Sequence, residues 1–181
     1  MQRINSVDYD SSDAQTQEIL TAVKSKMGMV PNLISALSQS TAAVNSYLAF
    51  SQNLSEGVLP ARLREQIALA VGEANSCGYC VSAHSMIAKG AGLSTDEVAA
   101  ARGADASDEK ERAALQFVQA MVRERGRVSD SDLENLRNAG FGDTEIVEIV
   151  AHVALNTFTN YFNHVANTEI DFPLAPALAT A

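Results

Sequence analysis

Residues 77–84 read Cys-Gly-Tyr-Cys-Val-Ser-Ala-His, and the rest of the sequence is interpreted outward from this segment. It holds both cysteines of the chain and one of its three histidines. The helical pattern breaks at residues 75–76 and resumes until Gly90 or Gly92, so the segment is predicted to open a helix. At a helix N-terminus, this spacing brings both sulfur atoms to one side, within reach of a disulfide bond. His84 then lies one turn after Cys80 on the same face.

Such an arrangement is typical of redox chemistry. The N–H groups and the dipole at a helix N-terminus stabilise a thiolate, and His84 can accept the thiol proton of Cys80. Two carboxylates of the preceding helix could orient the imidazole, and their spacing alone does not choose between them. Glu73 stands isolated in a nearly uncharged segment, whereas Glu65 follows two arginines and could simply form a surface ion pair.

We expect neither a metal nor a cofactor. Zinc binds four ligands in a structural site, or three and a water molecule in a catalytic one. Cys77, Cys80 and His84 would make three ligands, two other histidines remain, and the spacing matches no zinc finger. A redox pair is therefore favoured over a zinc site, and also over two buried core cysteines, because the pair stands at a helix start.

The overall composition argues against several classes of binding partner. The chain of 181 residues has 22 acidic and 13 basic residues and a net charge of −9. This charge disfavours binding to nucleic acid or to anionic lipid. The beginning of the chain lacks the apolar region of a signal peptide, and no run is long and apolar enough to span a bilayer. We therefore expect a cytoplasmic protein that binds neither nucleic acid nor membrane, in which a C-x-x-C pair indicates redox chemistry.

The apolar pattern predicts an all-α fold. Alanine and leucine dominate, and no stretch alternates β-branched and polar residues with a period of two. Eight or nine helices are expected in one domain. Their approximate positions are residues 12–26, 33–37, 40–53, 60–74, 77–90, a short helix from 94, 108–125, 129–139 and 143–168.

The last predicted helix is unusual, because residues 149–168 contain no charged side chain if histidine is neutral. Such a helix is usually surrounded by protein, so it should be central to the fold or buried in a subunit interface. His152, Asn156, Asn160 and His164 recur every four residues and are predicted to form one polar stripe. This stripe is either a structural hydrogen-bond network or a partial lining of the redox pocket, with Asn160 and His164 as accessory candidates.

The spacing of Glu65, Cys77, Cys80 and His84 resembles the signature of the AhpD-like alkylhydroperoxidases, within the carboxymuconolactone decarboxylase superfamily. The sequence of residues 64–84 is similar to the peroxidase-related branch of that family. Decarboxylase members of the superfamily lack the cysteine pair, so a lactone decarboxylase is disfavoured.

The resemblance covers a core of about residues 40–125 and extends to the end of the chain, over residues 160–173. It implies one AhpD-like domain over residues 1–181, with a long C-terminal helix at about 143–168. The best-studied members have a histidine directly before the second cysteine, where this chain has Tyr79. This departure bears on catalytic efficiency and on the reductant, and it makes Tyr79 a further accessory candidate.

The resemblance also implies the roles of the site residues. Cys80 would be the peroxidatic cysteine and Cys77 the resolving one. His84 and Glu65 would form the proton relay, which favours Glu65 over Glu73 where spacing did not decide.

The implied function is a thiol-dependent peroxidase that reduces hydrogen peroxide or alkyl hydroperoxides in antioxidant defence. An external dithiol or a disulfide reductase would regenerate it, and family members are homo-oligomers such as trimers or hexamers. Two alternatives stay open. One is a general dithiol–disulfide oxidoreductase or redox sensor that uses the same residues. The other is a binding or scaffold protein with a vestigial cysteine pair.

Overall fold

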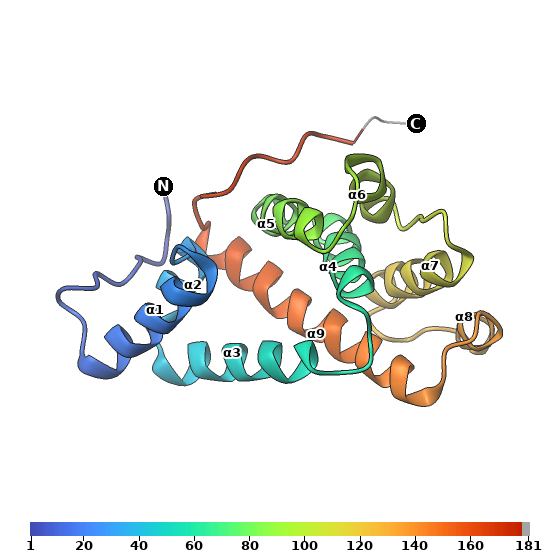
Figure 1. Cartoon of the computed structure of the whole chain (residues 1–181), viewed down its shortest axis with the longest axis horizontal. Helices are drawn as coiled ribbons and strands as arrows, with labels where there is room; N and C mark the ends of the chain where they lie inside the picture. Colours follow the sequence, from blue (N-terminus) through green and yellow to red (C-terminus); the bar gives the residue numbers. More distant parts are fainter. Residues whose placement is uncertain (179–181) are drawn as a thin grey trace.

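The computed structural model describes residues 1–178, and the last residues of the predicted domain, 179–181, lie outside this part. Within the described part the chain forms nine helices and no strand, which confirms the all-α prediction (Figure 1). The helices are α1 (Ala14–Met27), α2 (Asn32–Leu37), α3 (Thr41–Ser55), α4 (Ala61–Ala74), α5 (Gly78–Gly90), α6 (Thr95–Arg102), α7 (Glu109–Arg123), α8 (Asp130–Asn138) and α9 (Asp143–Ala166).

Side-chain caps set the beginnings of several helices. Ser94 and Ser129 both form reciprocal capping boxes, which fix the starts of α6 and α8 near the expected positions. The first helix begins at Ala14, two residues later than expected. Here Asp13 is the cap, because its side chain accepts a hydrogen bond of 2.9 Å from the Thr16 backbone N–H.

Helix α4 lies at the centre of the molecule (Figure 1). Every residue from Gln66 to Gly72 is buried, and the helix packs against α5, α6, α7 and α9. The close packing of α4 against α5 depends on Gly72, where a Cβ atom would lie 3.2 Å from Val81 Cγ2. The first turn of α5 therefore sits directly on the end of α4.

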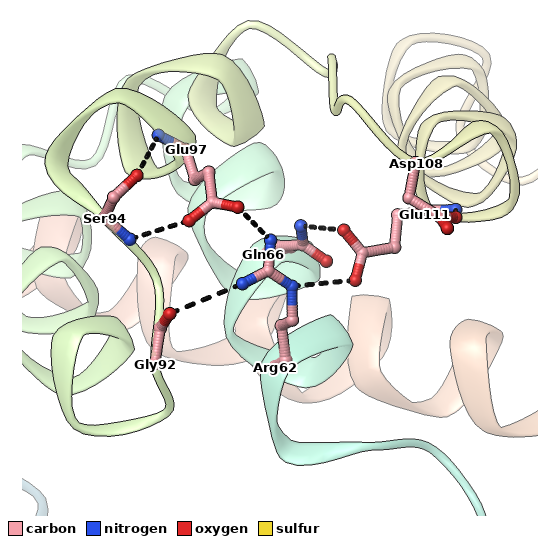
Figure 2. Close-up of polar contacts among 7 residues, drawn as sticks. All are labelled: Arg62, Gln66, Gly92, Ser94, Glu97, Asp108 and Glu111. Atoms are coloured by element: carbon pink, nitrogen blue, oxygen red, sulfur yellow. Dashed lines mark hydrogen bonds and ion pairs between the residues drawn. The ribbon is translucent and has the colours of Figure 1, made fainter.

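A polar network around Arg62 joins the beginning of α4 to α6 and α7 (Figure 2). The Arg62 guanidinium lies 2.5 Å from Glu97 of α6 and 2.9 Å from Glu111 of α7. One turn further, Gln66 Nε2 donates to the second Glu111 oxygen at 2.7 Å. The hydrogen bond from Arg62, followed by that from the Ser94 backbone N–H, lowers the pKa of Glu97 to about 2. The network thus anchors the helix that carries Glu65 and Glu73.

Helix α9 crosses the molecule and contacts α2, α3, α4, α5 and α7 (Figure 1). It ends two residues before the predicted position 168, because Asn167 turns into the left-handed conformation with φ of 49°. Its buried polar residues are His152, Asn156, Thr159, Asn160 and Asn163. Its large exposed apolar residues are Val147, Val150, Phe158, Tyr161 and Val165.

After α9 the chain passes across α5 toward α6 (Figure 1). Phe172 is buried and packs edge-on against the Tyr79 ring, with 5.6 Å between the ring centroids. The Ala175 backbone N–H donates to Ser82 Oγ at 3.2 Å. Among residues 1–178, no helix combines the length and the apolarity that a membrane crossing requires.

Candidate redox site

The turn between α4 and α5 places the two cysteines at a helix N-terminus. Ser76 adopts a left-handed conformation with φ of 56°, which redirects the chain after α4. Cys77 is the N-cap of α5, and its sulfur accepts the Cys80 backbone N–H at 3.3 Å. The cap and the third helical position are thus both cysteines, so their side chains face each other.

Cys77 and Cys80 form a disulfide bond with 5.3 Å between their Cα atoms. The side chains are only 1% and 3% exposed and belong to an apolar cluster with residues of α1, α2, α3 and α5. Cys77 lines a cavity of about 320 Å³ between α5 and the C-terminal segment. Access to the sulfur atoms is therefore controlled by the surrounding elements.

His84 and Glu65 are directly paired. His84 Nδ1 of α5 lies 2.8 Å from Glu65 Oε2 of α4, and each side chain is about one-fifth exposed. A carboxylate in this position fixes the orientation of the imidazole ring. The structure thus brings together two of the four signature residues on facing helices.

The His84–Glu65 pair borders a small polar cavity of about 150 Å³. Tyr47 lines it as well, and burial, with a smaller contribution from the Glu65 charge, raises the pKa of this phenol. His152 Nε2 is buried there without a hydrogen-bond partner among the described residues. Burial, assisted by the charge of Arg64, lowers the pKa of His152, so this imidazole is neutral at neutral pH.

A larger groove of about 330 Å³ adjoins the same pair. It shares Tyr47, Glu65 and His84 with the polar cavity, but most of its walls are apolar. The apolar residues that line it are Val23, Met27, Leu33, Ile34, Leu48, Ala83, Ile87 and Phe172. The site therefore offers a polar cavity and an apolar groove, and the imidazole–carboxylate pair borders both.

Tyr79 is a wall residue of this apolar groove. Its hydroxyl accepts the Leu33 backbone N–H at 3.2 Å, and burial raises the pKa of the phenol. Its contacts, to α2 and to Phe172, are those of a residue that holds the groove together.

Two accessory candidates stand away from the His84–Glu65 pair. Glu73 binds Arg102 of α6 at 2.8 Å, and the Arg102 guanidinium also donates to the Pro176 carbonyl at 2.7 Å. The carboxylate that looked isolated in the sequence is thus neutralised by a residue 29 positions later. His164 is exposed on α9, so the polar stripe does not continue to it.

His164 lies outside the buried face of α9 because of the number of residues per helical turn. Four residues advance about 400° around an α-helix, so a four-residue repeat drifts by about 40° at each step. From His152 to His164 the drift reaches about 120°, which takes His164 out of the buried face. Asn160 remains buried, and its Oδ1 accepts Asn75 Nδ2 at 3.0 Å, in the turn that leads to Cys77.

The residue that lies against the sulfur atoms is Asn163, which the sequence did not single out. Its Nδ2 lies 3.3 Å from Cys80 Sγ and 4.0 Å from Cys77 Sγ. The signal was present in the sequence, because a position seven residues after Asn156 returns to the same face of a helix. In residues 1–178, no group of three or more histidine, cysteine and acidic side chains is arranged to hold a metal ion.

Comparisons with known proteins place these residues in a wider group. Residues 41–123 match the model of the carboxymuconolactone decarboxylase family. This range of the chain includes the four signature residues Glu65, Cys77, Cys80 and His84. A search of the curated proteins finds no match.

Several solved structures are similar over nearly the whole chain. A peroxidase-related protein of Ralstonia eutropha, described as an alkylhydroperoxidase AhpD core, is 23% identical with a TM-score of 0.85, over 94% of this chain and 92% of its own. A peroxidase-related protein of a Silicibacter species is 25% identical with a TM-score of 0.80, over 92% and 91%. A variant of the debrominase Bmp8 in complex with 2,3,4-tribromopyrrole is 22% identical with a TM-score of 0.80, over 93% and 91%.

Proposed function

The chain is an AhpD-like member of the carboxymuconolactone decarboxylase superfamily, and on that premise we propose that it is a thiol-dependent peroxidase. Its substrates are hydrogen peroxide or alkyl hydroperoxides, and its redox centre is the Cys77–Cys80 pair. The observation that carries the proposal is the His84–Glu65 pair at 2.8 Å, in which His84 lies on α5, one turn after Cys80 of the buried cysteine pair. This combination provides a base, a group that orients it and a nucleophile.

In the first half of the reaction, the reduced protein attacks the hydroperoxide. His84, oriented by Glu65, takes the proton of Cys80. The thiolate attacks the terminal oxygen of R–O–O–H, an S–O bond forms, and the O–O bond breaks. Sulfur loses two electrons and becomes a sulfenic acid, and the leaving alkoxide takes the proton back from His84.

In the second half, Cys77 closes the cycle. Its thiolate attacks the sulfur of the Cys80 sulfenic acid, and a proton and the hydroxyl group leave as water. The product is the Cys77–Cys80 disulfide, the state that the structure describes. An external dithiol then reduces it by thiol–disulfide exchange.

The apolar groove supports organic hydroperoxides as the better substrates. An apolar organic group in this groove lies next to His84, whereas hydrogen peroxide would leave the apolar walls without a partner. Tyr79 has a place in the proposal as a wall of that groove.

The test is the consumption of cumene hydroperoxide and hydrogen peroxide with a dithiol reductant. We expect turnover by the wild-type chain and none by Cys80→Ser. In the absence of the reductant, Cys77→Ser should react once and stop, with the sulfenic acid left on Cys80. A Cys80→Ser variant with wild-type turnover would contradict the assignment of Cys80 as the peroxidatic cysteine.

The same residues also suit a general dithiol–disulfide oxidoreductase or a redox sensor. That alternative predicts fast exchange with disulfide substrates and slow reaction with hydroperoxides. Measuring both rates on one preparation of reduced protein decides between the two functions.

Reductive dehalogenation is a second candidate, favoured by the similarity to a debrominase and by the apolar groove beside His84. In this reaction two thiols reduce an aryl bromide to the arene, and bromide, a proton and the disulfide are released. Bromide release from 2,3,4-tribromopyrrole by the reduced chain is the direct measurement.

We further propose that copies of the chain associate through the exposed apolar face of α9. With a net charge of −9, two copies repel each other unless they meet at an uncharged surface, and α9 carries no charge after Glu148 if histidine is neutral. An apolar face can also pair with its own copy about a two-fold axis. Whether the assembly is a trimer, a hexamer or a dimer, and the cytoplasmic location, stay predictions.

A further inference from the structure

We propose that Asn163 is a catalytic residue whose side-chain amide binds the sulfur of Cys80, first as thiolate and then as sulfenic acid. This inference rests on the proposed peroxidase function. It concerns a residue of α9 that lies outside the family signature of Glu65, Cys77, Cys80 and His84.

The contact is direct and enclosed. Asn163 Nδ2 lies 3.3 Å from Cys80 Sγ, and the side chain is only 5% exposed. In the described residues, the Cys80 backbone N–H is already directed at Cys77 Sγ, so it is not the donor to its own sulfur. Asn163 is therefore the side chain that donates a hydrogen bond to Cys80 Sγ in this structure.

The amide interacts differently with each state of the sulfur. A disulfide sulfur is a weak acceptor, whereas a thiolate is ionised, and hydrogen bonds to ionised acceptors are roughly twice as strong as neutral ones. Enclosure increases this difference, because no water competes for the N–H groups. The contact thus favours the thiolate and promotes the reaction of Cys80 with the hydroperoxide.

The amide oxygen of Asn163 can accept a hydrogen bond from the sulfenic acid that this reaction forms on Cys80. Asn163 Oδ1 is buried and accepts no hydrogen bond in the described residues. A buried acceptor without a donor costs free energy, so a state that supplies a donor is stabilised. When the S–O bond forms and the O–O bond breaks, Cys80 gains an S–O–H group within the reach of this amide. The new hydroxyl is the missing donor for Oδ1.

The position of Asn163 is fixed by its surroundings. Its backbone carbonyl accepts the N–H groups of Asn167 and Thr168, which close the end of α9. One turn earlier, Asn160 holds Asn75 at the start of the cysteine turn. The side-chain amides of Asn160 and Asn163 therefore bind the turn before Cys77 and the Cys80 sulfur, respectively. Both contacts hold Asn163 in place against Cys80.

The experiment uses the full chain with Cys77→Ser, so that Cys80 is the single thiol. To this we add Asn163→Leu, which keeps the size and removes both polar ends, or Asn163→Asp, which keeps the shape and replaces the donor by a carboxylate. The thiolate is titrated by its ultraviolet absorbance, and the sulfenic acid formed with cumene hydroperoxide is trapped by a dimedone-type probe and counted by mass spectrometry.

We expect Asn163→Leu to lower the thiolate fraction at neutral pH about tenfold, and Asn163→Asp to lower it further through charge repulsion. Sulfenic acid formation should slow in the same order. With Cys77 restored, the disulfide of Asn163→Leu should become harder to reduce, because a tenfold loss lowers the potential by about 30 mV. His164→Gln, on the adjacent and exposed position of α9, is the matched control and should leave all three quantities unchanged.

A purely structural role for Asn163 would change the melting temperature but not the titration midpoint of the folded protein. The proposal is overturned if Asn163→Leu and Asn163→Asp both fold and keep the midpoint and the trapping rate within about twofold of the parent. If Asn163→Leu does not fold, Asn163→Asp and Asn163→Ser give the same comparison. If the wild-type chain consumes no hydroperoxide, the proposed function fails, and the titration alone then decides whether Asn163 binds the sulfur.

Discussion

His84 Nδ1 of α5 and Glu65 Oε2 of α4 are 2.8 Å apart, and the pair borders both the polar cavity and the apolar groove. The carboxylate accepts the Nδ1 proton, so Nε2 is the ring nitrogen that exchanges protons with other groups. Any chemistry at His84 therefore depends on a residue 19 positions earlier in the chain.

We expect Glu65→Gln to lower kcat/KM for hydroperoxides by about a hundredfold, because the base loses the carboxylate that orients it. The measurement is steady-state peroxide turnover with a saturating dithiol. Glu73→Gln is the matched control, since Glu73 is engaged by Arg102. It should lose some stability and keep its turnover, and equal losses in the two variants would contradict the assignment of Glu65.

Local spacing was sufficient for much of this site. The all-α fold, the capping box at Ser94 and the position of Cys77 and Cys80 at a helix start all follow from residues within one or two turns of each other. These features depend on backbone hydrogen bonds and short-range packing, which the sequence encodes directly.

Contacts between helices could not be derived in the same way. The partner of Glu73 is Arg102, and nothing in the sequence around either residue indicates the other. The choice of Glu65 rested on a family resemblance, because the spacing within α4 is compatible with either carboxylate. The prediction of the polar stripe on α9 was wrong at His164. Residues spaced by four positions do not stay on one face of an α-helix, because each step turns by about 400°.

From the apolar groove we expect a preference for organic hydroperoxides over hydrogen peroxide, and a single bulky side chain in the groove should remove it. Ile87 of α5 is half-buried in its wall, so Ile87→Phe fills part of the space next to His84. We expect kcat/KM for cumene hydroperoxide to fall about tenfold, with a smaller change for hydrogen peroxide, which needs no apolar space. Turnover of both substrates by one variant preparation is its own control. Equal losses for the two substrates would show that the groove does not bind the organic group.

Acid sensitivity should originate partly in the network of Figure 2. The pKa of Glu97 is lowered to about 2, first by the hydrogen bond from Arg62. Because the folded-state pKa is depressed, the stabilisation is fully present above the unfolded value of about 4.5 and is lost as the pH falls through about 2.

Glu97→Gln keeps the capping box of α6, since glutamine also serves at this position, and removes the charge. The variant should unfold at lower urea concentration than the wild type at neutral pH. The difference should shrink as the pH falls from about 4.5 towards 2, where wild-type Glu97 is also protonated. Asp96→Asn, in the same turn of α6, controls for the change in net charge. A difference between wild type and Glu97→Gln that is constant with pH would contradict the role of this ion pair.

Self-association through α9 can be tested on its exposed apolar face. Tyr161 is 59% exposed and Val165 is 63% exposed, one turn apart in the part of α9 that has no charged side chain if histidine is neutral. A lysine at either position places an unpaired charge in the centre of an apolar interface, which is strongly unfavourable. We expect light scattering at micromolar concentration to give an oligomer for the wild type and a monomer for Tyr161→Lys or Val165→Lys. Asn135→Lys, at an exposed position of α8, should leave the mass unchanged. If the wild-type chain is a monomer under these conditions, the apolar face of α9 does not bind a second copy.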